Sequence, residues 1–107
     1  MDYKVKYSDD AKRDIENIFS HIADVLIEPA SARRLTDKLI EKANSLDFMP
    51  FRHQACETEP LKSRGIRFFP VDKYLIFYLP NENQKTVEII RIMHGSADVE
   101  KHLPAEN

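Results

Sequence analysis

The sequence of 107 residues is short of several residue types on which specialised folds depend. It contains one cysteine, two glycines and no tryptophan. With Cys56 alone, the chain can form neither an intramolecular disulfide framework nor a metal site of several cysteines. Two glycines are also too few for a glycine-rich phosphate-binding loop. A disordered chain is excluded as well, because 42% of the residues are hydrophobic.

An excess of charge and long hydrophobic runs are likewise missing. Lys and Arg number 16 against 18 Asp and Glu, which gives a formal net charge of −2. This balance argues against a dedicated nucleic-acid binder, and we expect no direct sequence-specific binding of DNA. The longest apolar runs, such as 74–79, fall far short of the roughly 20 residues that cross a bilayer, and the first residues lack a signal-peptide core. We therefore expect a cytoplasmic protein without a membrane partner.

The first half of the sequence predicts one strand and two helices. Alternating apolar residues mark a strand at 3–7, and Ser8 suits the N-cap of an amphipathic helix over 9–26. Pro29 fits the first position of a second helix, which Pro50 ends. Because only a short break separates the two helices, they should form an antiparallel hairpin.

The second half predicts a loop, three strands and a short final helix. The stretch 50–64 has no periodicity and predicts the loop. Strands follow at 65–69, 74–79 and 86–93. Pro70 should lie at a strand end or on an edge strand, since it has no N–H for a ladder. A short helical turn over 96–103 ends the pattern.

These elements predict an α+β fold in a single domain over residues 1–107, because two independent cores would leave each half marginal. A helical hairpin packs on one face of a small, mainly antiparallel four-stranded sheet, in the order β-α-α-β-β-β followed by the short helix. The first strand joins the other three at an edge. The strand at 74–79 is apolar on both sides, so both faces of the sheet need a cover. The hairpin covers one face, and we predict that a partner's helix or strand covers the other.

The pattern offers no metal, cofactor or activated nucleophile. None of the four histidines stands at metal-ligand spacing from another histidine or from Cys56, so we expect no metal and no cofactor. His53 precedes Cys56 closely, but nothing in the pattern fixes their geometry. A thiol without a catalytic role is the simpler interpretation.

Phosphate chemistry is the remaining possibility. Arg67, Arg91 and His94, if they met near Tyr78, could cleave RNA, with one group deprotonating the 2′-hydroxyl and the arginines holding the phosphate. Strict alternation argues against such a cluster. It groups Arg91 with Val87, Ile89 and Met93, and His94 with Glu88, Ile90 and Ile92. In the simpler interpretation, the arginines pair with acids such as Glu88 or lie on an open face.

One stretch departs from the even charge and is called the basic stretch below (residues 62–73). It carries Lys62, Arg64, Arg67 and Lys73 against the single acid Asp72, and it includes Phe68 and Phe69. It is either a solvated strand pair with core phenylalanines or a surface for an acidic partner or nucleic acid. The balanced charge of the whole chain favours a protein partner.

An ordered set of short segments runs through residues 3–103. Its members are Tyr7-Ser8 with Ala11 and Asp14-Ile15, Pro29-Ala30, Leu46 with Pro50, Leu61 with Gly65-Ile66-Arg67, the strand 74–78, and residues 87–95. With the order strand, helix, helix and three strands, this set resembles the RelE/ParE toxins of bacterial type II toxin–antitoxin systems. The ParE branch, often labelled plasmid stabilisation proteins, is the closer match.

The resemblance implies one of two activities. RelE-like members cut messenger RNA on the ribosome with Lys, Arg and a C-terminal Tyr, whereas ParE-like members poison DNA gyrase without hydrolysis. This chain has Leu75 and Gly95 at two positions that are often Arg in the nuclease branch, and no tyrosine follows Tyr78. Without these groups cleavage would lose electrostatic stabilisation, so the resemblance favours a gyrase inhibitor that is not an enzyme. The alternatives are a non-toxic binding protein that kept the fold and a RelE-like ribonuclease using Arg67, Arg91 and His94.

The same resemblance implies a partner. Such toxins are neutralised by a small antitoxin whose C-terminal segment wraps the helical hairpin and the sheet. We therefore expect a ParD-like or similar antitoxin in a toxin–antitoxin hetero-oligomer, and DNA gyrase as the target. The residues expected to bind target or partner are Lys62, Arg64, Arg67, Tyr74, Tyr78, Arg91 and His94.

Overall fold

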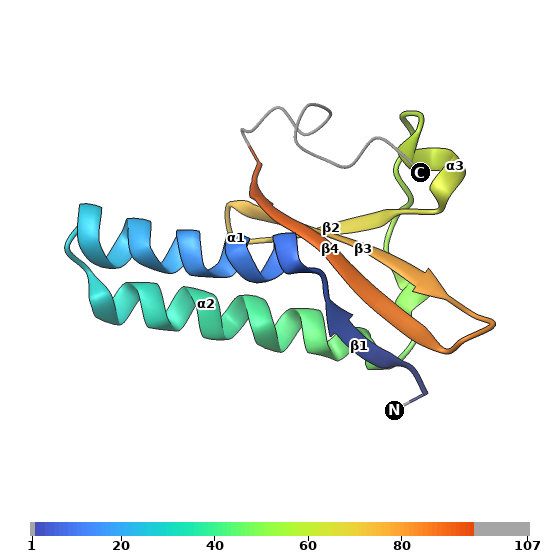
Figure 1. The fold of residues 1–107 in the computed structure, drawn as a ribbon, viewed down its shortest axis with the longest axis horizontal. Coiled ribbons are helices and arrows are strands. Elements are labelled where there is room, and N and C mark those ends of the chain that lie inside the picture. The colour runs from blue at the N-terminus through green and yellow to red at the C-terminus, as the bar shows by residue number, and fades with distance from the viewer. Residues whose placement is uncertain (1, 96–107) are drawn as a thin grey trace.

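Two helices lie side by side on one face of a four-stranded sheet (Figure 1). The computed structural model describes residues 2–95. Its strands and main helices are, in chain order, β1 (Lys4–Tyr7), α1 (Asp9–Ser20), α2 (Pro29–Asn44), α3 (Leu61–Arg64), β2 (Arg67–Val71), β3 (Tyr74–Asn81) and β4 (Thr86–His94). The predicted α+β fold and the order of its elements are confirmed, and the turn predicted at 96–103 lies outside the described residues. No helix in the described part of the chain is long and apolar enough to span a membrane.

The sheet brings the first strand beside the last. Its strand order is β1-β4-β3-β2, with β1 parallel to β4 and the other two pairs antiparallel. β1 therefore lies at an edge, as predicted, and β2 lies at the other edge, where Pro70 is accommodated. The Phe68 N–H in β2 donates to the Gln54 carbonyl oxygen at 3.1 Å. Because Pro70 has no N–H and that of Phe68 is used, this edge offers little to an added strand.

Local sequence explains where both helices of the hairpin begin. The Ser8 hydroxyl oxygen accepts the Ala11 N–H at 3.0 Å and its O–H donates to the Ile90 carbonyl oxygen at 2.8 Å. One side chain thus caps α1 and fastens it to β4. Two acids follow in the first turn of α1, where the helix dipole favours negative charge. Pro29 is the first residue of α2, as predicted.

The first helix changes geometry near its end, which the periodicity does not reveal. It is α-helical to Ser20 and continues as a π-helical turn over His21–Val25. Ile27 then takes a left-handed φ of 55°, and the Glu28 N–H donates to the Ile22 carbonyl oxygen at 3.1 Å. The connection between the helices is called the hairpin tip below (residues 24–28) and lies at the left in Figure 1.

The main core lies between the helical hairpin and the sheet. Tyr78 and Leu39 are among its largest fully buried side chains. The buried members of this core are Ala11, Ile18, Leu39, Ala43, Leu46, Phe69, Val71, Ile76, Tyr78, Val87, Ile89 and Ile92. They come from the apolar stripes of both helices and from one side of each of β2, β3 and β4, so the hairpin covers one face of the sheet as predicted.

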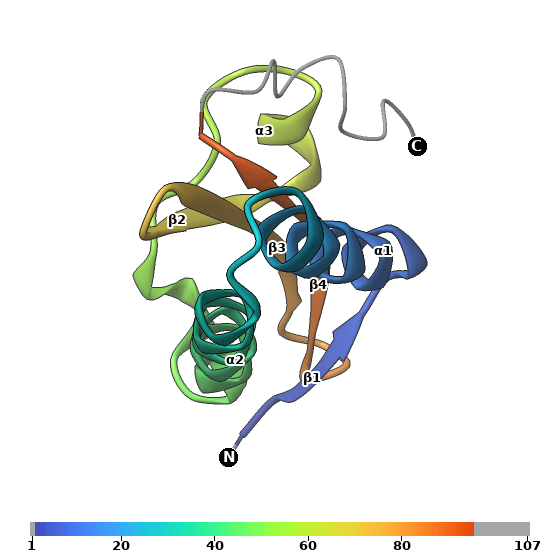
Figure 2. The ribbon, with the colours of Figure 1, turned by 90° about the vertical axis from the view of Figure 1, so that its left-hand side faces the viewer.

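A second cluster lies on the opposite face and corrects the prediction of a loop at 50–64. This segment contains a 3₁₀ turn at Pro50–Arg52 and helix α3, and in Figure 2 the strand β2 runs between α2 and α3. The buried members of the cluster are Cys56, Leu61, Ile66, Phe77, Ile90 and Met93. The segment was predicted as a loop because its apolar residues, such as Cys56, stand singly and form no helical or strand periodicity in the sequence. The chain thus covers part of the face that was expected to need a partner.

A bulge overturns the predicted grouping of side chains in the last strand. The register of β3 against β4 shifts between Phe77 and Tyr78, which leaves Ile90 as an extra residue in β4. Beyond it, Ile92 faces the helices and Met93 faces the second cluster. Strict alternation predicts the reverse. That prediction was wrong beyond Ile90, because a bulge leaves no mark in the alternation of apolar residues.

Candidate functional site

The residues considered for RNA cleavage are engaged by different parts of the fold, beginning with Arg67. Its Nη1 donates to the carbonyl oxygens of Phe51, at 3.3 Å, and of His53. Its guanidinium carbon also lies 5.2 Å from the centroid of the Phe51 ring. Arg67 therefore holds the segment after α2 against β2. It satisfies backbone carbonyls rather than the acid that the sequence suggested.

Arg91 is engaged by helix α1. Its Nε donates to Oδ2 of Asp14 at 2.7 Å, and the two side chains are only 20% and 12% exposed. The hydrogen bond to Asp14 is the main cause of a raised Arg91 pKa. The expectation that Arg91 pairs with an acid is confirmed, but the acid is Asp14 on the helix and not Glu88 on the same strand.

His94 and Tyr74 meet where β4 ends and β3 begins, and Tyr78 does not join them. The His94 and Tyr74 rings pack edge to face with centroids 5.3 Å apart. Tyr78 is fully buried, and its hydroxyl donates to the Pro50 carbonyl oxygen at 2.6 Å. Burial raises the pKa of Tyr78 to about 12. Tyr78 was expected to bind a partner, and the structure places it in the main core instead.

His53 and Cys56 belong to opposite sides of the sheet. The His53 ring stacks on Phe69, a member of the main core, with centroids 4.2 Å apart. Cys56 is buried in the second cluster. Burial lowers the pKa of His53, with a smaller contribution from neighbouring Arg52, and burial raises the pKa of the Cys56 thiol. Both shifts oppose a thiolate–imidazolium pair, so the arrangement favours a thiol without a catalytic role.

The basic stretch does not form one surface. Lys62 and Arg64 lie on α3, whereas Lys73 lies beyond the other end of β2, in the turn that leads to β3. Of the two phenylalanines, Phe69 belongs to the main core and Phe68 packs against the second cluster. The cations of this stretch therefore serve separate parts of the molecule.

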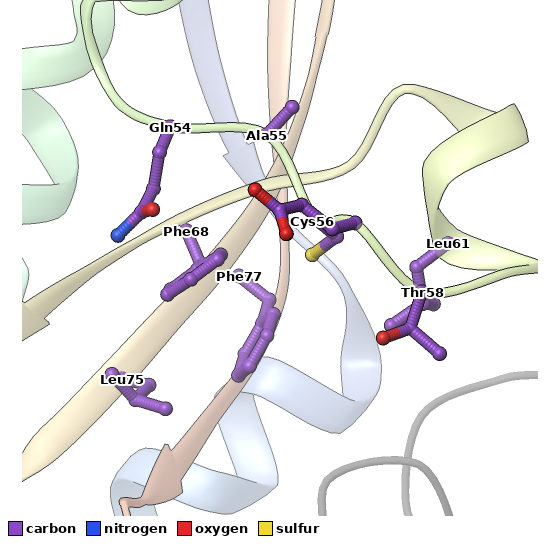
Figure 3. A pocket seen from close by; sticks show the side chains of 9 residues that line it. Gln54, Ala55, Cys56, Thr58, Leu61, Phe68, Leu75 and Phe77 are labelled. Carbon is purple, nitrogen blue, oxygen red and sulfur yellow. The ribbon is translucent and has the colours of Figure 1, made fainter.

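A groove of about 380 Å³ opens on the face of the sheet opposite the helical hairpin (Figure 3). We call it the sheet groove. The rings of Phe68 and Phe77 stack with centroids 5.6 Å apart and form its floor together with Leu75. The segment that precedes and includes the start of α3 forms its wall. The wall residues are Gln54, Ala55, Cys56, Glu57, Thr58 and Leu61.

The lining of the sheet groove suits binding of an apolar segment better than catalysis. Glu57 is the one ionisable acid or base among its described lining residues besides the Cys56 thiol. Leu75, singled out from the sequence as a departure from the nuclease pattern, lies in its floor. Across residues 2–95, no three His, Cys, Asp or Glu side chains gather closely enough to hold a metal ion. A mostly apolar concave surface with few polar groups is typical of a peptide or ligand groove.

Two features of the surface were not predicted from the sequence. The first is the wall of the sheet groove, which comes from the segment predicted as a loop. The second is a set of exposed apolar side chains: Val25, Leu26 and Ile27 at the hairpin tip, and Phe48, Met49 and Phe51 after α2. Periodicity places Val25 and Leu26 in the buried stripe of the first helix. The π-helical turn, which ends at Val25, changes the phase of the helix, and both side chains are exposed instead.

Comparison with known proteins yields a family and a set of similar folds. The family model described as the ParE toxin of the type II toxin–antitoxin system parDE matches residues 5–99. No match was found among curated proteins. The matched residues include every strand and helix described above except Lys4, the first residue of β1.

Three solved structures with a similar fold are a ParDE chain, a RelBE2 chain and a RelE toxin. A chain of the chromosomal ParDE system from P. aeruginosa has a TM-score of 0.71 and 21% identity, over 87% of this chain and 96% of that chain. A chain of the RelBE2 toxin–antitoxin complex from Mycobacterium tuberculosis has a TM-score of 0.66 and 22% identity, over 88% and 92%. A mutant of the E. coli toxin RelE in the free state has a TM-score of 0.60 and 14% identity, over 96% and 100%. At these identities the likeness shows the fold.

Proposed function

Because this chain belongs to the family of ParE toxins of type II toxin–antitoxin systems, we propose that it inhibits DNA gyrase in the bacterial cytoplasm and that a cognate ParD-like or similar antitoxin holds it inactive. The observation that carries the choice of gyrase over RNA is the engagement of both strand arginines within the fold. Arg67 holds backbone carbonyls, and Arg91 holds Asp14.

Cleavage of RNA would require cations and a base around one phosphate. Arg67 and Arg91 make contacts with two different elements, and His94 packs against Tyr74 at the end of the sheet. The floor of the sheet groove is apolar, with Leu75 where a phosphate would need a positive charge. These features support a toxin that acts by binding its target and not by hydrolysis.

The sheet groove is the proposed seat of the antitoxin. Phe68 and Leu75, the partly exposed residues of its floor, would be withdrawn from water by an apolar segment, at roughly 25 cal/mol for each Å² of apolar surface buried. Lys62 and Arg64 on α3 stand beside the wall residue Leu61 and suit acidic residues of that segment. The segment lies in the groove rather than adding a strand to β2, because that edge has few N–H groups to offer.

The residues proposed to contact target or partner are now fewer than the sequence suggested. Lys62, Arg64, Tyr74 and His94 keep this role, because each has exposed or half-exposed surface. Arg67 and Arg91 are assigned to the stability of the fold, and buried Tyr78 is withdrawn from the set.

A gyrase supercoiling assay tests the proposal. The purified chain should inhibit supercoiling of a relaxed plasmid by gyrase, and the antitoxin should restore it. A mock preparation carrying a folded, unrelated protein of the same size serves as the control. Absence of inhibition together with absence of gyrase binding would remove the proposal. RNA cleavage by the chain, alone or on ribosomes, would identify a ribonuclease, and normal growth of cells that express it without antitoxin would identify a non-toxic relic.

A further inference from the structure

The hairpin tip exposes three consecutive apolar side chains. Val25, Leu26 and Ile27 are 65%, 53% and 79% exposed, although isolated apolar residues are the norm on a surface. Ile27 also occupies the left-handed region, at φ 55°, after the end of a helix, where glycine is the usual residue. A β-branched side chain is strained there. Ile27 therefore brings neither solubility nor local stability to the monomer.

A cavity of about 660 Å³ lies directly beside the hairpin tip, and we call it the tip cavity. Its apolar lining is Ile22, Leu26, Leu35 and Tyr74, and its polar lining is His21, Ser31, Asp72, Lys73 and His94. Leu26 belongs to both the tip and the cavity. A protruding apolar surface and a hollow apolar surface thus share one residue.

The charges of these two surfaces are opposite. The hairpin tip carries Asp24 and Glu28 on either side of its apolar residues. The tip cavity carries Lys73, and the charge of its acid Asp72 is taken by Lys38, whose Nζ lies 2.9 Å from Oδ1. Within residues 2–95, neither Asp24 nor Lys73 forms an ion pair with another side chain.

We propose that two copies of this chain associate about a two-fold axis near Leu26, with the hairpin tip of each copy seated in the tip cavity of the other. Two adjacent surfaces that are both apolar and carry opposite charges meet the requirement of a two-fold interface, in which a residue i contacts j and j contacts i. The paired contacts are Ile27 against Tyr74 and Leu35, and Asp24 and Glu28 against Lys73. Because each copy contributes only the short hairpin tip and one cavity, we expect the association to be weak and reversible.

Analytical ultracentrifugation of the purified full chain, over about 5–200 µM, tests the association. We expect a monomer–dimer equilibrium whose dissociation constant rises about tenfold or more in Leu26→Asp, because a carboxylate would be buried at the axis. Circular dichroism and the thermal midpoint verify that this exposed substitution leaves the fold intact. A chain that is monomeric throughout the range, or a dimer unaffected by Leu26→Asp, would overturn the proposal.

A charge exchange gives a test that does not depend on any single variant. The variant Asp24→Lys with Glu28→Lys and the variant Lys73→Glu should each lose the dimer, because like charges then face each other. Mixed in equal amounts, the two variants should form a heterodimer, because both pairs of contacts are again opposite in charge. Failure of the mixture to associate, when wild type does, would overturn the proposed arrangement.

Ile27→Gly separates the dimer from the stability of the monomer. Relief of the left-handed strain should raise the urea midpoint, while loss of the apolar contact should raise the dimer dissociation constant about fivefold. Lys85→Gly is the matched control, since Lys85 has φ 56° but lies outside the proposed interface. It should raise the midpoint and leave the dimer unchanged. Equal effects of the two variants on the dimer would contradict the role given to the hairpin tip.

Discussion

The carboxylate of Asp14 and the guanidinium of Arg91 form a two-point contact between α1 and β4. Nε lies 2.7 Å from Oδ2, and Nη2 lies 3.0 Å from Oδ1. The same Oδ2 accepts the N–H of Ile92 at 2.9 Å. Because β1 ends opposite Ile89, no strand among the described residues pairs with this edge of β4 beyond that point. Asp14 thus takes the place of a strand at this edge and also neutralises the half-buried Arg91.

Replacement of Asp14 should cost much more stability than replacement of an exposed acid in the same helix. Asp14→Ala leaves Arg91 without its carboxylate and the Ile92 N–H without its acceptor, so the free energy of unfolding should fall by about 2–4 kcal/mol. Asp10→Ala removes the exposed pair with Arg13 and one acid from the first turn of α1, and it should cost about 1 kcal/mol or less. Urea unfolding followed by circular dichroism measures both. Similar losses in the two variants would contradict the structural role of Asp14.

The buried hydroxyl of Tyr78 should make stability depend on alkaline pH. The pKa of Tyr78 is raised in the fold to about 12 from its ordinary value of 10.0. Because the folded-state pKa is the higher one, its contribution is complete below pH 10 and is lost as the pH rises toward 12. Over that interval, wild type should lose roughly 2–3 kcal/mol more than Tyr78→Phe.

Urea titrations of both proteins between pH 9 and pH 12 measure this difference. At neutral pH, Tyr78→Phe should itself be less stable by about 1–2 kcal/mol, because the Pro50 carbonyl oxygen loses its buried donor. Parallel pH profiles for the two proteins would show that Tyr78 ionises as readily in the fold as in the unfolded chain.

Substitution of Gly65 by alanine should measure the cost of a left-handed backbone alone, because the added Cβ meets no steric conflict. Gly65 ends α3 at φ 80°, and a Cβ placed on it would meet only Leu79 Cδ1, at an ordinary 3.8 Å. Gly65→Ala should therefore cost about 1 kcal/mol, all of it from the left-handed backbone. A fluorescence or circular-dichroism unfolding curve gives the value. A loss of several kcal/mol would mean that the segment before β2 rearranges as well.

The sheet groove yields a prediction for the antitoxin. Leu75→Asp places a carboxylate on the apolar floor and should weaken antitoxin binding by tenfold or more, measured by calorimetry with the antitoxin's C-terminal peptide. Leu26→Asp, on the other side of the sheet, is the matched control and should leave that affinity unchanged. The reverse result would place the antitoxin at the hairpin tip.

The sequence predicts those features of the structure that neighbouring residues determine, and it does not predict those that depend on contacts between distant segments. Ser8 and Pro29 act within one helical turn, and both helix starts were predicted correctly. The extra residue Ile90 arises from the pairing of two strands, so the faces of β4 beyond it could not be predicted. Arg91 finds its acid in Asp14, which is remote in sequence, and only the tertiary fold brings the two together.

The surface was harder to predict than the core. Leu75 was singled out as a departure from a nuclease, and it does lie in the floor of a groove. The wall around it comes from a segment with single apolar residues such as Cys56, which give no periodic signal. Leu26 fits the helical stripe, and only the π-helical turn explains its exposure.

The parallel pairing of β1 with β4 has a consequence for the synthesis of this protein. β1, which begins at Lys4, is synthesised first, but it can pair with β4 only after Thr86 and the following residues have been synthesised. Until then the sheet lacks β4, which separates β1 from β3, and the helical hairpin can pack only on β2 and β3. A chain that stops before Thr86 lacks Val87, Ile89 and Ile92 of the main core, so we expect it not to complete the fold. The topology of the sheet thus ties completion of the main core to the synthesis of its last strand.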